Sequence, residues 1–258
     1  MRTLLTNSGT GKTYASAFAM RELGFKRVLF LVHRVTLAKQ AKKSFEKVFD
    51  KKVTMGLVGA GFYEYEKDYV FATVETLNRD THLFQYQPDA FDCIILDEAH
   101  HSSNNIYTKI INYFNPKLFL GMTATPDKRD DNQEGKNIYE IFHYQIAHEI
   151  RLQQAMEDNL LCPFHYFGIS EVVSLDDKTL QAAKLTDEEF NQLTSDERVR
   201  HVIEQSEYYG YSGDRVRGLI FCSRVKECEE LSRKFNALGY RTIALSGADN
   251  EEKRQEAF

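Results

Sequence analysis

The sequence lacks the long apolar run that a membrane-spanning helix needs. Such a helix takes ~20 consecutive apolar residues, and no stretch of the 258-residue chain approaches that length. No secretory leader is expected, because Met1–Leu5 leads directly into the first expected strand. The sequence also has no internal repeat and no low-complexity tract. These absences predict a globular, cytoplasmic protein with no membrane partner.

Cysteine is scarce, and its spacing argues against a zinc site. The chain has four cysteines, and none of them forms a C-x-x-C pair. Structural zinc sites draw on closely spaced cysteine and histidine ligands. We therefore expect buried thiols in a reducing compartment rather than a metal centre.

Histidine raises a second metal hypothesis, because His100 and His101 follow Asp97 and Glu98 directly. Adjacent residues at the end of a strand rarely chelate one ion well. A dedicated zinc or iron site is therefore not expected.

The formal net charge of −5 argues against a passive, highly basic coating protein. The charge is unevenly distributed, since residues 1–60 carry 12 Lys and Arg against 3 Asp and Glu. Much of this positive charge falls in residues 34–52. Two interpretations remain open for these lysines: a solvated helical face, or a basic stripe that binds phosphate backbones in a salt-dependent way.

Short apolar strands alternate with helical segments, which predicts an α/β fold with a parallel sheet. The expected strands are 2–6, 27–32, 53–57, 69–73, 93–97 and 117–122. The expected helices are 12–23, 35–49, 104–114, 138–142, 148–160, 196–209 and 225–238. Apolar segments at 215–223 and 240–247 flank the last of these helices, so they predict a further β-α-β unit. Residues 127–136 are expected to be a surface loop, and 175–193 a linker or small insertion.

The aromatic segment Gly61–Phe71 is open to two interpretations. Its rings could stack on nucleic-acid bases. Packing within a hairpin or the core is the favoured interpretation.

A glycine-rich turn, TNSGTGKT at Thr6–Thr13, separates the first strand from the first helix. Gly9 and Gly11 allow positive φ and a close approach of the backbone to a phosphate. The backbone amides of this turn then form an anion-binding nest at the helix N-terminus. Candidate nucleotide-binding residues are Ser8, Gly9, Thr10, Gly11, Lys12 and Thr13. Lys12 would neutralise the β- and γ-phosphates, and the Thr13 hydroxyl would ligate Mg²⁺.

An acidic pair ends the apolar strand that runs to Asp97. Open α/β sheets bind ligands at the carboxyl ends of their strands. Asp97 suits the Mg²⁺ shell, and Glu98 suits polarisation of an attacking water.

With TNSGTGKT, DEAH at Asp97–His100 and GMTATP at Gly121–Pro126 in this order, the chain resembles the superfamily 2 helicases and translocases. It is most similar to the DEAH-type motors of restriction enzymes, including the type III restriction subunits. LVHRVTLAKQ, FATVETL and GLIFCSRVKECEELS are similar to further motifs of that family. The loop departs from the general phosphate-binding pattern at Thr6, where the pattern has glycine.

The resemblance implies a RecA-like ATPase domain at 1–150, a helical connection at 151–210 and part of a second RecA-like domain at 211–258. Its catalytic residues would be Lys12, Asp97 and Glu98, with Thr13 and Asp97 on the metal. Arg34 and Thr73 would contact nucleic acid, whereas His100, Thr123 and Thr125 would couple the two sites.

Several expectations follow from this resemblance. The expected cofactors are ATP and Mg²⁺. The expected partner is nucleic acid, with DNA favoured over RNA. A fused or associated nuclease module is a further expected partner. We expect a fragment of a longer polypeptide with weak ATP turnover, because the family's second-domain arginine is absent from these residues. A nucleotide-dependent switch that binds ATP without translocating is the alternative, and a small-molecule kinase is a weaker one.

Overall fold

The computed structural model describes residues 2–7, 11–50, 53–101, 105–124, 138–169 and 186–257. The chain divides into two compact units, Met1–Pro163 and Phe164–Phe258. The expected surface loop at 127–136 lies outside the described residues, as do 170–185.

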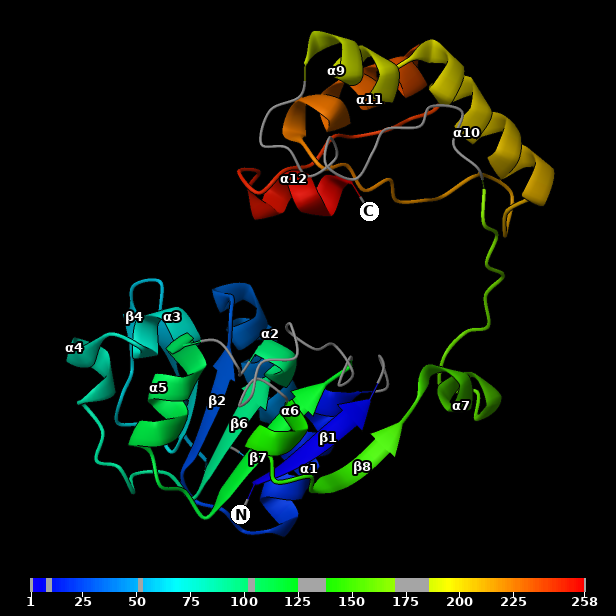
Figure 1. Cartoon of the computed structure of the whole chain (residues 1–258). Coiled ribbons are helices and arrows are strands. Elements are labelled where there is room, and N and C mark those ends of the chain that lie inside the picture. The colour runs from blue at the N-terminus through cyan, green and yellow to red at the C-terminus, as the bar shows by residue number, and fades with distance from the viewer. Residues whose placement is uncertain are drawn as a thin grey trace. The chain divides into compact units, whose positions relative to one another are not determined.

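The first unit is built on a mostly parallel sheet of eight strands (Figure 1). Its order is β4-β3-β5-β2-β6-β7-β1-β8, and only the β3–β4 pair is antiparallel. The strands are β1 Arg2–Asn7, β2 Val28–Val32, β3 Met55–Gly59, β4 Phe62–Tyr63, β5 Tyr69–Thr73, β6 Cys93–Asp97, β7 Leu118–Thr123 and β8 Ile146–Ile150.

Helices flank the sheet and connect its parallel strands (Figure 1). In the first unit these are α1 Lys12–Glu22, α2 Val35–Glu46, α3 Val74–Leu77, α4 Asp80–Leu83, the 3₁₀ turn η1 Ala99–His101, α5 Asn105–Tyr113, α6 Ile138–Ile141 and α7 Leu152–Glu157. The described part of the second unit contains α9 Asp187–Leu193, α10 Asp196–Tyr209, α11 Val225–Ala237 and α12 Glu251–Glu256.

The central strands are buried on both faces, because alternate residues enter two different cores. In β2, Phe30 packs with α1 and α2 in one cluster, whereas Leu31 packs with α3 and α5 in the other. Strand β6 repeats this division with Ile95 and Ile94. This two-sided burial explains why these strands are continuous apolar runs, and it fixes their register.

The α/β class and the parallel sheet are confirmed, and most expected elements are found within two residues of their predicted ends. The helix expected over 148–160 is partly wrong, because Ile146–Ile150 forms β8 beside β1 and the helix begins only at Leu152. Ile146, His148 and Ile150 alternate along this segment, and so short a run fits either a helical or a strand period. The open edge of β1 decided between them.

The two strands expected at 215–223 and 240–247 are not found, since helices are the only regular elements among the described residues of the second unit. A strand requires a hydrogen-bonded neighbour, and neither segment pairs with one in the part of the unit that the structure describes. Leu219, Ile220 and Phe221 remain exposed at 67%, 53% and 91%. Here the apolar pattern alone did not produce a sheet.

Phe45 of α2 anchors the core on the α1–α2 face. Its side chain is fully buried, and its ring centroid lies 5.2–6.2 Å from those of Phe30, Phe49, Tyr69 and Phe71. We expect Phe45→Ala to lower the free energy of unfolding by about 3–5 kcal/mol, because it leaves a cavity among these rings. Urea denaturation followed by circular dichroism measures this loss. Phe18→Ala is the matched control on α1, where the ring is 45% exposed, and we expect it to cost less than about 1 kcal/mol.

Candidate active site

The carboxyl ends of β1, β7 and β6 meet at one edge of the sheet. Strand β7 lies between the other two, with Thr123 opposite Thr6 of β1 and Met122 opposite Asp97 of β6. Parallel neighbours lie ~4.8 Å apart, so the ends of β1 and β6 are separated by about 10 Å. This edge therefore brings together the glycine-rich turn after β1 and the acidic pair at the end of β6, which lie far apart in the sequence.

The turn after β1 leads directly into α1. Gly11 is the N-cap of α1 with φ 86°, a left-handed conformation that favours glycine, and its carbonyl accepts a hydrogen bond of 3.0 Å from the Ala15 amide. Lys12 and Thr13 are half-buried in the first turn, which contains no acidic residue. The positive end of the helix is therefore uncompensated by its own first turn. Ser8, Gly9 and Thr10 lie outside the described residues.

Asp97 lies in a setting that disfavours its own charge. Burial raises the pKa of its carboxyl, and the Glu98 carboxylate raises it further. A backbone hydrogen bond from Glu98 and the electrostatic effects of Lys12 and His33 oppose this shift without cancelling it. Lys12 of the glycine-rich turn therefore lies within electrostatic reach of Asp97. An added cation at this edge would favour the ionised carboxylate.

Glu98 is held in a strained backbone conformation with φ 51°. A non-glycine residue with positive φ is uncommon, and such strain gathers at functional sites. The Glu98 Oε2 lies 3.3 Å from His100 Nδ1, which in turn lies 3.0 Å from the hydroxyl of Thr123. The structure thus links the end of β6 to the end of β7, and Thr123 is fully buried. Thr125 lies outside the described residues.

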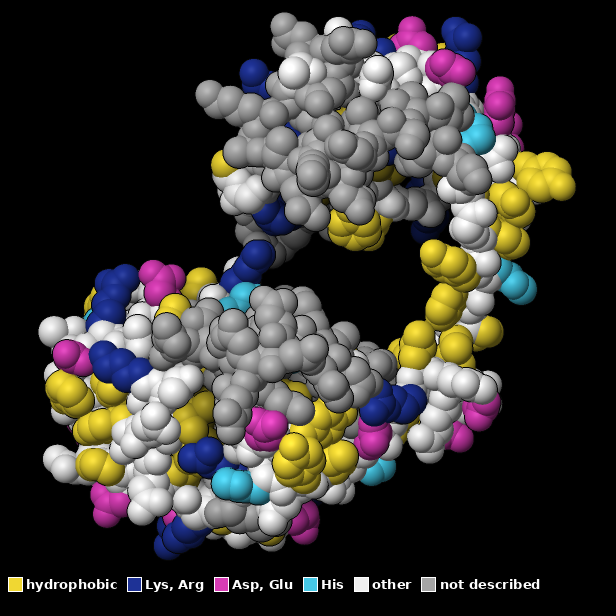
Figure 2. Space-filling view, in the orientation of Figure 1, with side chains coloured by type: hydrophobic (Ala, Val, Ile, Leu, Met, Phe, Trp, Pro, Cys, Tyr) yellow, Lys and Arg dark blue, Asp and Glu magenta, His cyan; other side chains and the backbone are white. Residues whose placement is uncertain are grey.

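The two expected nucleic-acid contacts lie at the same edge of the sheet but differ in exposure. Arg34 is exposed at the N-cap of α2, directly after β2. Thr73 is buried at the end of β5, and its hydroxyl donates to Thr76 Oγ1 at 2.8 Å. Beyond them, Figure 2 shows Lys and Arg, Asp and Glu, and hydrophobic side chains interspersed on the surface over β4, α3 and α4.

Two further residues near the acidic pair were not assigned to the site from sequence. His33 follows β2, and its electrostatic effect lowers the pKa of Asp97. Tyr107 of α5 is 5% exposed, and its hydroxyl has no hydrogen-bond partner among the described residues. Burial, together with the Asp97 and Glu98 carboxylates, raises the pKa of Tyr107 to about 12. Its position in an amphipathic helix predicts only a core residue, so no sequence signal marks it.

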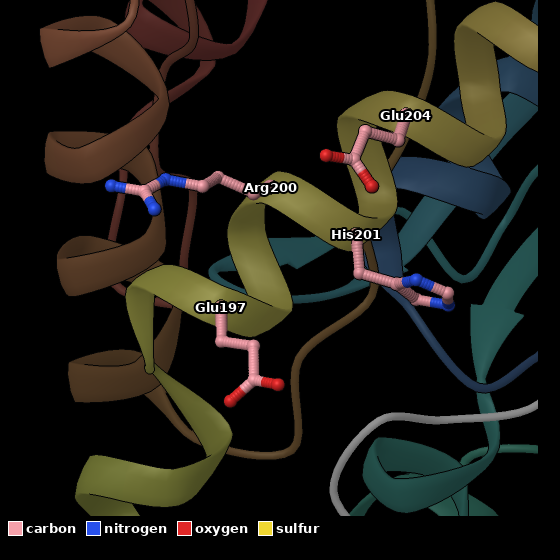
Figure 3. Close-up of a pocket in the computed structure, with 4 residues that line it drawn as sticks. All are labelled: Glu197, Arg200, His201 and Glu204. Carbon is pink, nitrogen blue, oxygen red and sulfur yellow. The ribbon is translucent and has the colours of Figure 1, made fainter.

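A hollow in the second unit is lined by Glu197, Arg200, His201 and Glu204. All four residues come from α10, and their side chains point apart, with Arg200 and His201 on opposite sides of the helix (Figure 3). They do not converge on a common point, so this hollow is not the site that the motifs predict. Among the described residues, no group of three or more His, Cys, Asp or Glu side chains is placed to hold a metal ion.

Within the described ranges, no helix has the length and apolar character needed to cross a membrane.

Comparisons with known proteins support the family resemblance. Residues 3–128 match the model of the family described as type III restriction enzyme, res subunit. Together with two curated relatives, this match supports a restriction-enzyme-like superfamily 2 helicase fragment. This match spans the glycine-rich turn, the acidic pair and Thr123, and it confirms the resemblance inferred from those motifs.

Two curated relatives illustrate the likeness. The chain is 30% identical over 170 residues to "Putative ATP-dependent helicase IRC3" of Saccharomyces cerevisiae, which covers 62% of this chain and 23% of that protein. It is 25% identical over 259 residues to the type I restriction enzyme EcoAI endonuclease subunit of Escherichia coli, which covers 89% of this chain and 31% of that subunit. The chain thus spans about a quarter to a third of these relatives' length.

Solved structures show the same fold. The type ISP restriction-modification enzyme LlaBIII, solved bound to DNA, matches with a TM-score of 0.58 and 18% identity over 94% of this chain and 20% of that one. The helicase domain of Hef from Pyrococcus furiosus matches with a TM-score of 0.50 and 20% identity over 92% of this chain and 49% of that one.

The raised pKa of Asp97 makes its charge a cost to the folded state. Because the folded-state pKa lies above the usual value, the stabilising contribution of this group is lost as the pH rises through that pKa. We expect Asp97→Asn to raise the Tm of the ligand-free protein at neutral pH, by about 2–4 °C per kcal/mol relieved. The gain should shrink as the pH falls toward the ordinary carboxyl pKa of about 4. Differential scanning calorimetry across this pH range measures both effects.

Asp92→Asn is the matched control. Burial tends to raise the pKa of Asp92, but hydrogen bonds from Lys117 and from the backbone amides of Arg27 and Lys26 outweigh it, and the pKa is lowered. Its charge therefore stabilises the fold at neutral pH, and we expect its removal to lower the Tm. A lower Tm for both variants would contradict the account of Asp97.

Proposed function

We propose that the chain is the ATP-binding core of a nucleic-acid translocase that couples ATP hydrolysis to movement along a strand. The supporting observation is the shared edge of the sheet, where the lysine-bearing turn after β1 and the acidic end of β6 lie on either side of β7. A triphosphate tail fits this separation of about 10 Å. The electrostatic effect of Lys12 on Asp97 is consistent with a common site.

In this proposal the turn after β1 binds the phosphates. The N-terminus of α1 presents backbone amides and an uncompensated positive end, and Lys12 adds a formal charge. Ser8, Gly9, Thr10 and Gly11 would complete the nest around the β-phosphate.

The residues at this edge fit Mg²⁺. Thr13 offers a hydroxyl and Asp97 a carboxylate, both hard oxygen ligands, and the acidic pair is under-compensated by nearby cations. When bound, Mg²⁺ would neutralise charge on the β- and γ-phosphates. The chain's own residues then set the orientation of the substrate.

Glu98 is the residue proposed to orient and polarise the attacking water. Its strained backbone turns it out of the line of β6, and the contact with His100 fixes its carboxylate. Phosphoryl transfer depends mostly on such positioning and on charge.

The contact between His100 and Thr123 offers a path for coupling. His100 lies two positions after Glu98, and its Nδ1 is 3.0 Å from the hydroxyl of Thr123 at the end of β7. We propose that changes at the γ-phosphate pass through this contact and then through Thr125 to the bound strand.

The nucleic acid is proposed to run across the carboxyl edge of the sheet, past Arg34 and the turn at Thr73. Arg34 is exposed at the N-terminus of α2, a suitable position for a phosphate. Thr73 is buried and its hydroxyl donates to Thr76, so Arg34 is the better placed of the two. The likeness to a restriction-enzyme endonuclease subunit favours DNA over RNA and a fused or associated nuclease module.

The direct test measures ATP binding and hydrolysis with and without single- and double-stranded DNA and RNA. It is carried out on this chain and on a longer polypeptide that contains it. We expect strand addition to stimulate hydrolysis in the longer polypeptide. If ATP binds but hydrolysis stays flat with every strand, the switch hypothesis replaces the motor.

Two substitutions separate binding from chemistry. Lys12→Ala should weaken ATP binding at least about tenfold, because a charged hydrogen bond to phosphate is lost. Glu98→Gln should preserve binding while lowering the hydrolysis rate about 100-fold or more, because the water loses its base. Isothermal titration calorimetry and a phosphate-release assay measure these two effects. Equal hydrolysis rates for Glu98→Gln and the parent would refute the role of Glu98.

Thr123→Val tests coupling, because it removes the hydroxyl that contacts His100 and changes the volume little. We expect basal hydrolysis to remain within about threefold of the parent, whereas stimulation by the strand is lost. Thr3→Val is the matched control, since Thr3 is also a buried threonine and its hydroxyl donates at 3.2 Å to the Gln145 carbonyl, in the segment that leads to β8. A similar loss of stimulation in both variants would point to a general packing effect and contradict the coupling role.

A further inference from the structure

The β3–β4 hairpin carries two exposed aromatic rings at the edge of the sheet. Its two-residue loop is Ala60–Gly61, and both residues have positive φ, as a tight hairpin turn requires. Phe62 and Tyr63 follow the loop and are 40% and 55% exposed. Both side chains therefore keep a large accessible surface, although Tyr63 contacts His82 and Phe62 contacts Lys39.

The ring of Tyr63 is held in place by a stack. It lies parallel to the His82 ring, with a centroid distance of 5.3 Å and an interplanar angle of 4°. His82 is itself fixed by a 2.5 Å hydrogen bond between its Nδ1 and the hydroxyl of Tyr65. A pre-ordered aromatic surface binds a flat partner with little further loss of side-chain entropy.

A positive charge accompanies the second ring. Lys39 of α2 places its Nζ 5.0 Å from the centroid of Phe62, and Lys39 is exposed. Aromatic rings beside exposed cations are the elements with which proteins bind single-stranded nucleic acid without sequence preference.

The acidic side chains of the hairpin and α3 have partners of their own. Glu64 accepts a hydrogen bond of 2.9 Å from the Leu57 amide, and Glu75 pairs with Arg79 at 3.4 Å. These contacts hold the two carboxylates to the protein.

The hairpin is continuous with the proposed path of the strand. Gly59, the last residue of β3, packs so closely on Thr73 that a Cβ at Gly59 would lie 2.7 Å from the Thr73 hydroxyl. Lys39 lies on the helix that begins after Arg34. The hairpin therefore adjoins Thr73 directly, and through Lys39 it contacts the helix that begins after Arg34.

We propose that the β3–β4 hairpin is a base-stacking site for single-stranded nucleic acid, in which Tyr63 on His82 takes a base and Lys39 beside Phe62 takes a backbone phosphate. The proposal rests on the proposed function, since it extends the strand path past Thr73. It assigns a role to Phe62 and Tyr63, whose exposed ring surface is not explained by packing within the hairpin.

The absence of tryptophan from the chain makes a direct test practicable. Tyr63→Trp introduces a single tryptophan at the site, and stacking of a base on it quenches its fluorescence. We expect oligothymidylate to quench it, whereas an abasic strand of the same length, which offers phosphates alone, leaves it unchanged. Phe18→Trp is the matched control, because Phe18 is also exposed and lies 4.9 Å from a cation, the Arg21 guanidinium, on α1. Equal quenching at both positions, or by the abasic strand, would overturn the stacking site.

Affinity measurements complete the test. Tyr63→Leu should weaken oligothymidylate binding about tenfold, the loss expected for one stacked base, whereas Tyr63→Phe should retain it. ATP binding by each variant reports that the first unit is folded. If Tyr63→Leu binds the strand like the parent, the hairpin site is wrong and the proposed function stands. If the parent binds ATP but no nucleic acid of any kind, the translocase proposal fails, and the hairpin site fails with it.

Discussion

Parallel pairing of β7 with both β1 and β6 is the constraint on which the proposed chemistry depends. It places Thr6 beside Thr123 and Asp97 beside Met122, so three chain segments end level at one edge. In β6 and β7, burial of alternate residues on both faces fixes the register, because a slip by one residue would exchange the two cores. The position of the acidic pair is thus a consequence of the apolar packing of β6.

Electrostatic imbalance and backbone strain coincide at the end of β6. Asp97 is half-buried beside a second carboxylate, and Glu98 adopts a left-handed conformation. Both features disfavour the isolated folded state, and both suit a site that binds cations and polyphosphate. The contact of His100 with Glu98 and Thr123 then links this strained segment to the neighbouring strand. The arrangement is consistent with a proposed site that is more stable with a cation and a polyphosphate bound than without them.

The surface near β4 lies at the same edge of the sheet but differs in its chemistry. The active-site end is dominated by charge, whereas the hairpin presents aromatic rings that stack on His82 or lie beside Lys39. Close packing of Gly59 on Thr73 joins these two regions. The second unit is different, because its apolar segments around Leu219–Phe221 stay exposed and unpaired among the described residues.

The sequence by itself determined the class of fold and predicted the residues of the proposed site. Apolar runs of five residues predicted β5 and β6 with their observed ends, and the family match over 3–128 agrees with the glycine-rich turn and DEAH. Local patterns could predict these features because residues close together in the sequence determine both the burial of a strand and the start of a helix. Only the tertiary structure decided that Ile146–Ile150 is a strand and that Thr73 is buried. It also decided that His33 acts on Asp97 and that Asp97 in turn acts on Tyr107. These features depend on which segments meet across the sheet, and spacing along the chain carries no information on contacts between residues so far apart.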